Sequence, residues 1–331
     1  MGAPHSLWPV FLSLISLPWA WFFLNRLASP LKVVRLKRLP QEGPGPQPPF
    51  TGRLTIGAYN LHHGLGVHPF SWNRPQRPPR QELDSRLTRL AALLRDANLD
   101  LVVLNEVDFA SFRTYHQNQA AYLAEHAGFP FWVEQTNVDA ALLFWRHRYG
   151  NALLSRHPLA NPRLVRLPGH RFGESVCWGK KNGLICDVHP FPEQLIRMLA
   201  IHLDHRLETT RIKSARVIEQ RRRTSPVPLI LAGDFNSSPA HYPQATLDPS
   251  GQTALSWLLA QGGYQTRPQP PELPSPLDLT FSTLNPRQVI DWILVPGDWH
   301  IHSHRVVDAG LSDHRLVLME VEITAGMARG A

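Results

Sequence analysis

Short apolar runs alternate with amphipathic stretches through most of the chain. Strands are predicted where an apolar run has the length of a buried strand, at 53–59, 99–107, 140–145, 151–156, 183–188, 198–203, 227–235, 289–296 and 316–323. Helices are predicted at 80–97, 116–129, 207–223 and 253–263, and in the first of these Leu83, Leu87 and Leu90 share one face. This alternation predicts one α/β domain rather than a chain of small modules.

An uncharged apolar run of 18 residues, Leu7 to Leu24, lies near the N-terminus. Its length just suffices to cross a bilayer, and Trp19 and Trp21 suit the membrane interface. A cleavable signal peptide and a buried core helix are the alternatives, but no Lys or Arg precedes the run, and it is long for an uncharged core helix. We therefore predict an uncleaved, single-pass anchor at residues 1–30. The basic residues follow the run, which favours a cytoplasmic position for the rest of the chain.

Positive charge is concentrated close to this run. The net charge is +8, and residues 1–38 contain no acid but five basic residues, namely Arg26, Lys32, Arg35, Lys37 and Arg38. The remainder carries only +3, so it gives no electrostatic footprint for a long nucleic-acid duplex, whereas the basic cluster suits a membrane surface. The predicted organisation is completed by a basic and proline-rich linker at 31–52, the α/β domain at 53–323 and a tail at 324–331.

Polar side chains stand at the ends of several predicted buried strands. They are Asn60, Glu106, His202, Asp234 and Asn236, together with Asp291 inside a strand and Asp313 and His314 just before one. A single residue of this kind is usually a turn former, but ligands of α/β proteins bind outside strand ends, where such a set would meet. Carboxylate and amide oxygens suit Mg²⁺, and imidazoles transfer protons or donate to phosphate. The sequence has neither the P-loop pattern of NTPases nor the Gly-x-Ser-x-Gly elbow of α/β-hydrolases.

Seven motifs carry these residues in a fixed order. They read YNLHHG, VVLNEVD, GNALLSRHPL, IHLDHR, LAGDFNSSP, IDWILV and LSDHRLV. Together they span about residues 53–323 and resemble the endonuclease/exonuclease/phosphatase superfamily of metal-dependent phosphoesterases, most closely its small bacterial members. The resemblance implies an α/β fold with four layers, in which two packed mixed β-sheets are flanked by helices.

The resemblance also implies a role for each matched residue. It implies a Mg²⁺ (or Mn²⁺) site at Asn60, Glu106 and Asp313, a phosphate contact at Asn151, and catalytic roles at His202, Asp234, Asn236, Asp291 and His314. Asp234 would activate water or serve as the acid–base group, and Asp291 would orient His314 and favour its imidazolium form. Asn236 would orient the phosphate or water, and His202 would donate to the phosphate or leaving group.

Some positions depart from the pattern or lie beside it. The residue before the predicted metal ligand Glu106 is Asn105. The family more often has Gln at this preceding position, and Asn105 keeps a side-chain amide. Two pairs follow matched residues closely and are equally well explained as pocket or as loop residues, namely His62 with His63 and Asp204 with His205.

The function predicted from these features is metal-dependent hydrolysis at phosphorus. We expect a membrane-anchored, monomeric phosphoesterase that hydrolyses a phosphodiester or phosphomonoester by metal-assisted attack of water, without a covalent intermediate. Nucleic acid and a phospholipid headgroup are both open as substrates. The alternative is a non-catalytic, membrane-tethered scaffold or binding protein that retains the fold.

Overall fold

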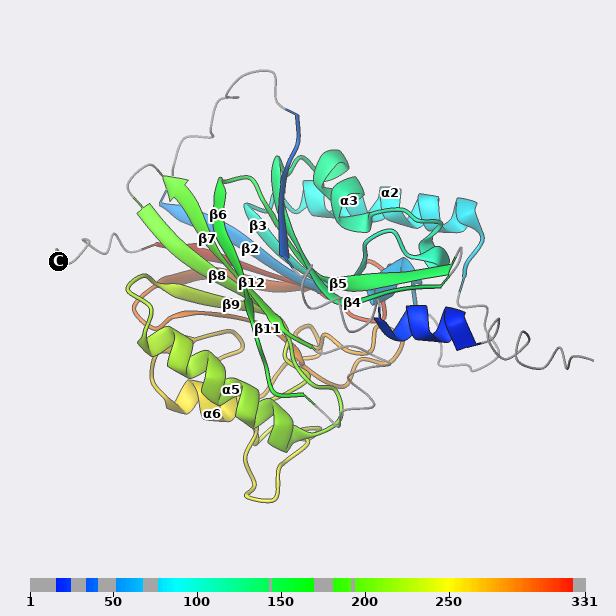
Figure 1. Cartoon of the computed structure of the whole chain (residues 1–331). Coiled ribbons are helices and arrows are strands. Elements are labelled where there is room, and N and C mark those ends of the chain that lie inside the picture. Colours follow the sequence, from blue (N-terminus) through cyan, green and yellow to red (C-terminus); the bar gives the residue numbers. More distant parts are fainter. Residues whose placement is uncertain are drawn as a thin grey trace, which may run out of the picture.

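Two mixed β-sheets stack face to face, and helices cover their outer faces (Figure 1). The computed structural model describes residues 16–24, 34–40, 52–67, 77–142, 145–169, 181–191 and 194–323. A core of apolar side chains from both sheets, including Ile56, Met198 and Ile230, fills the space between them. The α/β architecture predicted from the sequence is therefore confirmed.

The first sheet has seven strands. In spatial order they are β1 (Val34–Arg38), β4 (Phe131–Leu142), β5 (Trp145–Ser155), β3 (Leu101–Asp108), β2 (Arg53–Asn60), β13 (Leu316–Glu322) and β12 (His300–Val307). β2 and β3 are parallel, and every other neighbouring pair in this sheet is antiparallel. The parallel pair matters for function because the carboxyl ends of β2 and β3 lie side by side, with Asn60 opposite Asn105.

The second sheet has six strands. In spatial order they are β10 (Tyr264–Gln265), β11 (Asp291–Pro296), β9 (Leu229–Asp234), β8 (Gln194–His202), β7 (Gly183–Phe191) and β6 (Leu159–Val165). Only β8 and β9 are parallel in this sheet, and their register places His202 opposite Asp234. β11 runs antiparallel to β9 and begins at Asp291, which is also opposite Asp234.

Four α-helices form the outer layers. α2 (Arg80–Asp96) and α3 (Gln119–Ala127) cover the first sheet, while α5 (Glu208–Arg223) and α6 (Ala254–Ala260) cover the second (Figure 1). Leu83, Leu87 and Leu90 of α2 are fully buried, as their helical spacing predicts. α3 ends at Gly128, whose φ of 80° closes the helix in the left-handed conformation. Two short 3-10 helices, η2 (His62–Gly64) and η3 (Phe112–Thr114), follow strands of the first sheet.

The sequence pattern missed or misplaced several strands. β1 lies within the predicted linker, where basic residues hide a strand that pairs with β4 at the sheet edge. β4 was expected only near its end, because Glu134, Gln135 and Asp139 interrupt its apolar pattern. The single strand predicted at 140–145 is instead the end of β4 and the start of β5. β6 and β12 were also missed, and both expose polar residues along their length.

The N-terminal apolar run is described only in part. Residues 16–24 form a helix with largely exposed side chains, and the rest of the predicted anchor lies outside the described residues. Among the residues that are described, no helix combines the length and the apolar character that crossing a membrane requires. The spanning helix therefore remains a prediction, and so does the tail at 324–331, which is not described.

Gly233, next to Asp234 at the end of β9, has no room for a side chain. Its φ is 131°, and a Cβ there would lie 2.1 Å from the backbone oxygen of Ile201 in β8. We expect Gly233→Ala to destabilise the protein by about 3 kcal/mol, because both the backbone and its neighbour would have to move. Gly251→Ala is the matched control: its φ is 75°, but nothing lies within 4 Å of the added Cβ, so about 1 kcal/mol is expected. Urea denaturation measures both, and equal losses would contradict the steric explanation.

Candidate active site

The two sheets are joined by hydrogen bonds at the ends of their parallel strand pairs. The Asn60 side-chain amide at the end of β2 donates to Asp234 Oδ2 at the end of β9, over 3.1 Å. The Asn60 side-chain oxygen Oδ1 accepts from the backbone N–H of His62. Both Asn60 and Asp234 are at least 98% buried, so this contact is made away from bulk water. Residues from both sheets thus form one site, as the strand-end pattern predicts.

Asn105 of β3 also links the two sheets, through hydrogen bonds to residues of β5, β8 and β9. Its side-chain amide donates to Asn151 Oδ1 at 2.9 Å and to the backbone oxygen of Ile201 at 3.0 Å. Its own carbonyl oxygen accepts from the backbone N–H of Asp234 at 2.8 Å. Asn105 is completely buried, and these bonds satisfy both ends of its amide. Asn105, which stands where the family more often has Gln, therefore positions Asp234 through the backbone of that residue.

Asn151, the predicted phosphate contact, belongs to the same network. Its side-chain N–H₂ group donates to Gln135 Oε1 at 2.7 Å and to the backbone oxygen of Asn182 at 3.1 Å. Its oxygen accepts from Asn105, and the residue is completely buried. Asn151 therefore helps to hold Asn105 in place, and its phosphate contact stays a prediction.

Glu106 stands at an irregularity of β3. The β3–β5 register shifts between Leu104 and Val107, and Glu106 has a φ of 52°. Such bulges redirect a side chain out of the regular ladder, here into the site. The carboxylate lies 3.3 Å from His63 Nε2 and 3.8 Å from His202 Nε2. Burial alone would raise the pKa of Glu106, but the electrostatic interactions of its carboxylate with His63, His202 and Lys181 outweigh burial and hold the pKa below its usual range.

A chain of charged partners fixes His63. Its Nδ1 lies 3.2 Å from Asp108 Oδ1, and Asp108 in turn accepts two hydrogen bonds of 2.7 Å from Arg113. Burial lowers the pKa of His63, and Arg113 lowers it further. His63 therefore lines the site beside Glu106. Of its two interpretations, pocket residue and loop residue, the structure supports the first. Asp108 and Arg113 were missed, although Asp108 also ends a buried strand and could have been included on that ground.

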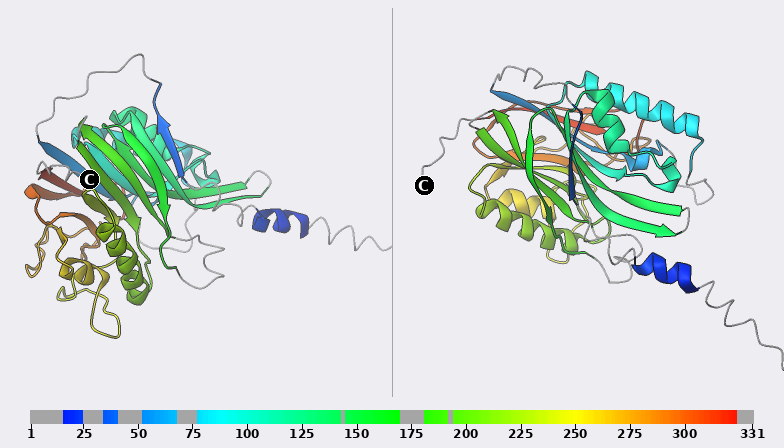
Figure 2. Two further views of the ribbon diagram at one scale, coloured as in Figure 1. Left: turned by 60° about the vertical axis from the view of Figure 1, so that its left-hand side comes forward. Right: turned by 45° about the horizontal axis from the view of Figure 1, so that its top comes forward.

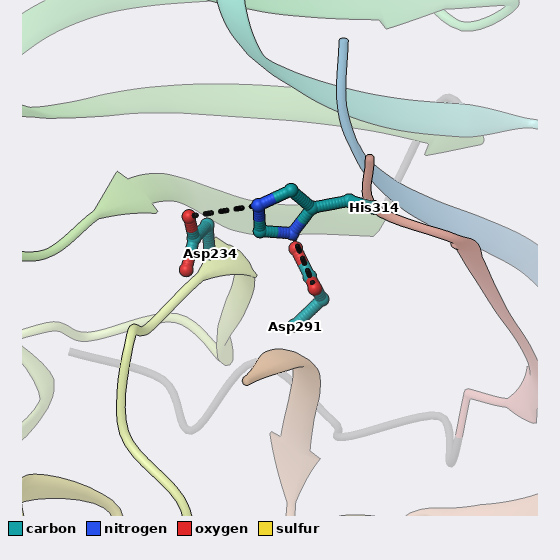
Figure 3. A group of neighbouring side chains, drawn as sticks. All are labelled: Asp234, Asp291 and His314. Carbon is teal, nitrogen blue, oxygen red and sulfur yellow. Dashed lines mark hydrogen bonds and ion pairs between the residues drawn. The ribbon is translucent and has the colours of Figure 1, made fainter. Parts of the chain in front are cut away.

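His314 lies between two aspartates (Figure 3). Its Nδ1 is 2.8 Å from Asp291 Oδ2, and its Nε2 is 3.9 Å from Asp234 Oδ2. Burial would lower the pKa of His314, but the charge of Asp291 and the hydrogen bond to it prevail and raise the pKa to about 10. The predicted Asp291–His314 pair is therefore formed, and its ring is imidazolium at neutral pH.

His202 approaches Asp234 from the other side. Its Nε2 lies 3.4 Å from Asp234 Oδ2 and 2.5 Å from Lys181 Nζ. Burial and the nearby charge of Lys181 lower the pKa of His202 to about 3, so the ring is neutral. Burial likewise lowers the pKa of Lys181, while Asp234 and Glu106 oppose that shift. Lys181 was not among the predicted site residues, since a lysine just before a strand carries no distinctive sequence signal.

The remaining predicted residues surround this centre. The backbone N–H of Asn236 donates to Asp234 Oδ1 at 2.8 Å, and its side-chain amide donates to the backbone oxygen of Leu203. Asp313 Oδ1 lies 3.5 Å from His62 Nδ1, which places His62 at the rim of the site as well. Asp204 accepts from the backbone N–H groups of Arg206 and Leu207, so its observed role is to shape the turn before α5.

The family of the chain follows from a comparison with known protein families. A profile described as the endonuclease/exonuclease/phosphatase family matches residues 57–314, which is well over half of the chain. The chain belongs to the endonuclease/exonuclease/phosphatase family. The match extends from Gly57 in β2 to His314 and so includes strands of both sheets and every predicted site residue.

Solved structures support the fold of this endonuclease/exonuclease/phosphatase family member. A family protein from Beutenbergia cavernae DSM 12333 has 21% identity and a TM-score of 0.57, covering 82% of this chain and 72% of that one. TDP2 from D. rerio, complexed with a single-strand DNA product, has 17% identity and a TM-score of 0.57, covering 82% and 99%. The mannosyl-6-phosphatase Bt3783 from Bacteroides thetaiotaomicron VPI-5482 has 16% identity and a TM-score of 0.56, covering 82% and 100%. No curated protein sequence matches the chain.

Two groups of side chains in this family member could hold a cation. Asp234, Asp291 and His314 offer ligand atoms that all lie within 4.8 Å of one another (Figure 3). The predicted set of Asn60, Glu106 and Asp313 offers oxygen atoms only, and the Glu106 and Asp313 side chains are 26% and 25% exposed. The endonuclease/exonuclease/phosphatase fold thus brings a buried Asp/Asp/His cluster and two more accessible carboxylates to the same strand ends.

Proposed function

We propose that the chain is a Mg²⁺-dependent phosphoesterase that hydrolyses a phosphodiester or phosphomonoester by direct attack of water. The observation that carries this proposal is the position of Asp234, which is hydrogen-bonded to Asn60 and lies between neutral His202 and imidazolium His314. A buried carboxylate beside one proton donor and one neutral imidazole suits proton transfer to and from oxygen atoms bound to phosphorus.

The donor atoms favour Mg²⁺ at Glu106, with Asn60 and Asp313. Mg²⁺ prefers oxygen ligands and retains several waters, which requires access to solvent. The partly exposed Glu106 and Asp313 carboxylates meet both conditions, whereas Asp291 is 1% exposed and already paired with His314. A protonated His314 also has no lone pair to offer a metal. Mg²⁺ bound there would offset negative charge on a phosphoryl oxygen.

The buried residues supply the proton chemistry in this proposal. Asp234 accepts the proton of the attacking water, held in place through Asn60 and the backbone of Asn236. Imidazolium His314 donates towards a phosphoryl or leaving oxygen, and Asp291 fixes its orientation. Lys181 and His202, whose Nζ and Nε2 atoms lie 2.5 Å apart, together supply a further hydrogen bond to the phosphate.

Hydrolysis of a generic diester tests the proposal. We expect the purified full chain to hydrolyse bis-p-nitrophenyl phosphate with Mg²⁺ or Mn²⁺ and to lose this activity in EDTA, because charge on phosphorus oxygens would no longer be offset. Release of p-nitrophenol measures it, and restoration by added Mg²⁺ is the control. Activity on no phosphoester with either metal would favour the non-catalytic scaffold.

We also propose that residues 1–30 attach the protein to a membrane, with the domain on the cytoplasmic side. The support is the uncharged run at 7–24 followed by basic residues. A chain begun at residue 31 keeps β1 and is expected to leave the membrane fraction, while the full chain stays in it after carbonate washing. Protease protection of the full chain in vesicles reports its side. A shortened chain that still sediments with membranes would overturn the attachment.

A further inference from the structure

Three aromatic rings form a row along one face of β5. Trp145, His147 and Tyr149 alternate along the strand, so their side chains point to the same side. The Trp145 and His147 rings are stacked with centroids 5.6 Å apart, and the His147 and Tyr149 centroids are 4.9 Å apart. All three residues are partly exposed, whereas Arg148 and Gly150 between and beyond them are buried. The row is therefore an accessible apolar strip.

The strip leads directly to the candidate active site. The Tyr149 ring lies edge to face with the His63 ring, with centroids 5.0 Å apart. His63 Nε2 in turn lies 3.3 Å from the Glu106 carboxylate, the proposed metal ligand. A ligand with its phosphate at Glu106 could therefore extend along these rings without leaving the surface of β5.

The other end of the strip meets the N-terminal apolar helix. The Phe22 and Trp145 ring centroids are 6.1 Å apart, and the helix lies beside the end of the β4–β5 hairpin (Figure 2). Residues 16–24 carry no charge, and large apolar side chains on this helix are about half or more exposed, namely Leu17, Trp19, Trp21, Phe23 and Leu24. Soluble proteins rarely expose such a surface, and tryptophans with neighbouring basic residues suit a lipid–water interface.

The charges beside the strip favour lipid over nucleic acid. A single nucleic-acid strand stacks on aromatic rings but also needs cations along its backbone. The arginines of this part of β5 instead alternate to its opposite face and are paired with acids of β4: Arg146 lies 3.1 Å from Asp139, and Arg148 lies 3.5 Å from Glu134. The strip thus offers ring surfaces, while the arginines between its residues face the other side of β5 with their charges offset. This arrangement matches an acyl chain better than a sugar–phosphate backbone.

We propose that Trp145, His147 and Tyr149 form a binding subsite for the apolar portion of a membrane lipid whose phosphate ester enters the site at Glu106. This inference rests on the proposed phosphoesterase function and names its substrate class. The lipid would pass from the bilayer at helix 16–24 along β5, with its headgroup phosphate reaching the buried His202, Asp234 and His314.

Paired substrates test the subsite in the full chain. The measurement is the ratio of kcat/KM for dioleoylphosphatidylglycerol in non-ionic detergent micelles to kcat/KM for its deacylated headgroup in the same micelles. We expect Trp145→Ala and His147→Ala each to lower this ratio about tenfold, because two or so methylene groups lose their apolar contact. His300→Ala is the matched control, since the His300 ring also contacts a strand histidine, edge to face, but lies on β12, and it should leave the ratio unchanged.

The outcomes separate the subsite from the proposed activity. An unchanged ratio of the two kcat/KM values in both strip variants would overturn the subsite. The same holds if both kcat/KM values fall by the same factor. A loss confined to hydrolysis of an oligothymidylate would overturn it in favour of base stacking. If the wild-type chain hydrolyses neither these substrates nor bis-p-nitrophenyl phosphate, the proposed function fails, and lipid binding then tests the subsite. Quenching by brominated phosphatidylglycerol should then be smaller in Trp145→Phe than in the wild-type chain, and equal quenching would overturn it.

Discussion

Replacing Glu106 by Gln is expected to remove Mg²⁺ binding and to lower the rate of phosphoester hydrolysis about a thousandfold. The substitution keeps the size of the side chain but removes the negative charge that His63, His202 and Lys181 now face. A hard divalent cation gains most of its affinity from such charge, so a neutral amide is a poor replacement. Calorimetric titration of Mg²⁺ measures the first effect, and hydrolysis of bis-p-nitrophenyl phosphate measures the second.

The control for this prediction is a glutamate far from the site. Glu125→Gln makes the same chemical change on the exposed surface of α3 and should alter neither quantity. Circular dichroism would verify that both variants fold. Wild-type Mg²⁺ affinity in Glu106→Gln would show that the cation binds elsewhere, and the Asp234, Asp291 and His314 cluster would then be the first alternative.

The sequence pattern predicted the elements whose buried residues are mostly apolar. Helix α2 repeats its leucines at helical spacing, and β3 and β9 are continuous apolar runs, so burial alone identifies them. β4 and β12 carry polar residues that the pattern cannot distinguish from loops. They pair with the next strands along the chain, β5 and β13, through backbone hydrogen bonds that the pattern of side chains does not record.

The sequence predicted most residues of the candidate site, but it predicted few of the contacts between them. Asp291 and His314 were expected to pair, and the structure places them 2.8 Å apart. Asn105 was noted only as a departure from the family pattern, yet it bonds the backbone of Asp234 across the two sheets. Lys181 reaches the site because the chain entering β7 passes His202, which depends on tertiary structure alone.

Asp291→Asn is expected to lower hydrolysis about a thousandfold while leaving the protein folded. The Asp291 carboxylate raises the pKa of His314 to about 10 and accepts from its Nδ1. Asparagine has the same shape but no charge, so it cannot stabilise the imidazolium, and burial then lowers the pKa of His314. At neutral pH the variant ring would be neutral, and the donor facing Asp234 and the substrate would be lost.

The pH dependence of kcat distinguishes this mechanism from a structural defect. Wild-type activity needs protonated His314, so it should persist through neutral pH and fall only as pH approaches 10. In Asp291→Asn the pKa is lower, so the same loss must begin at lower pH, and residual activity should recover as the medium is acidified. Asp298→Asn, an exposed change just after β11, should keep the wild-type profile. Equal activity losses at every pH in Asp291→Asn would show that Asp291 does not act through the protonation of His314.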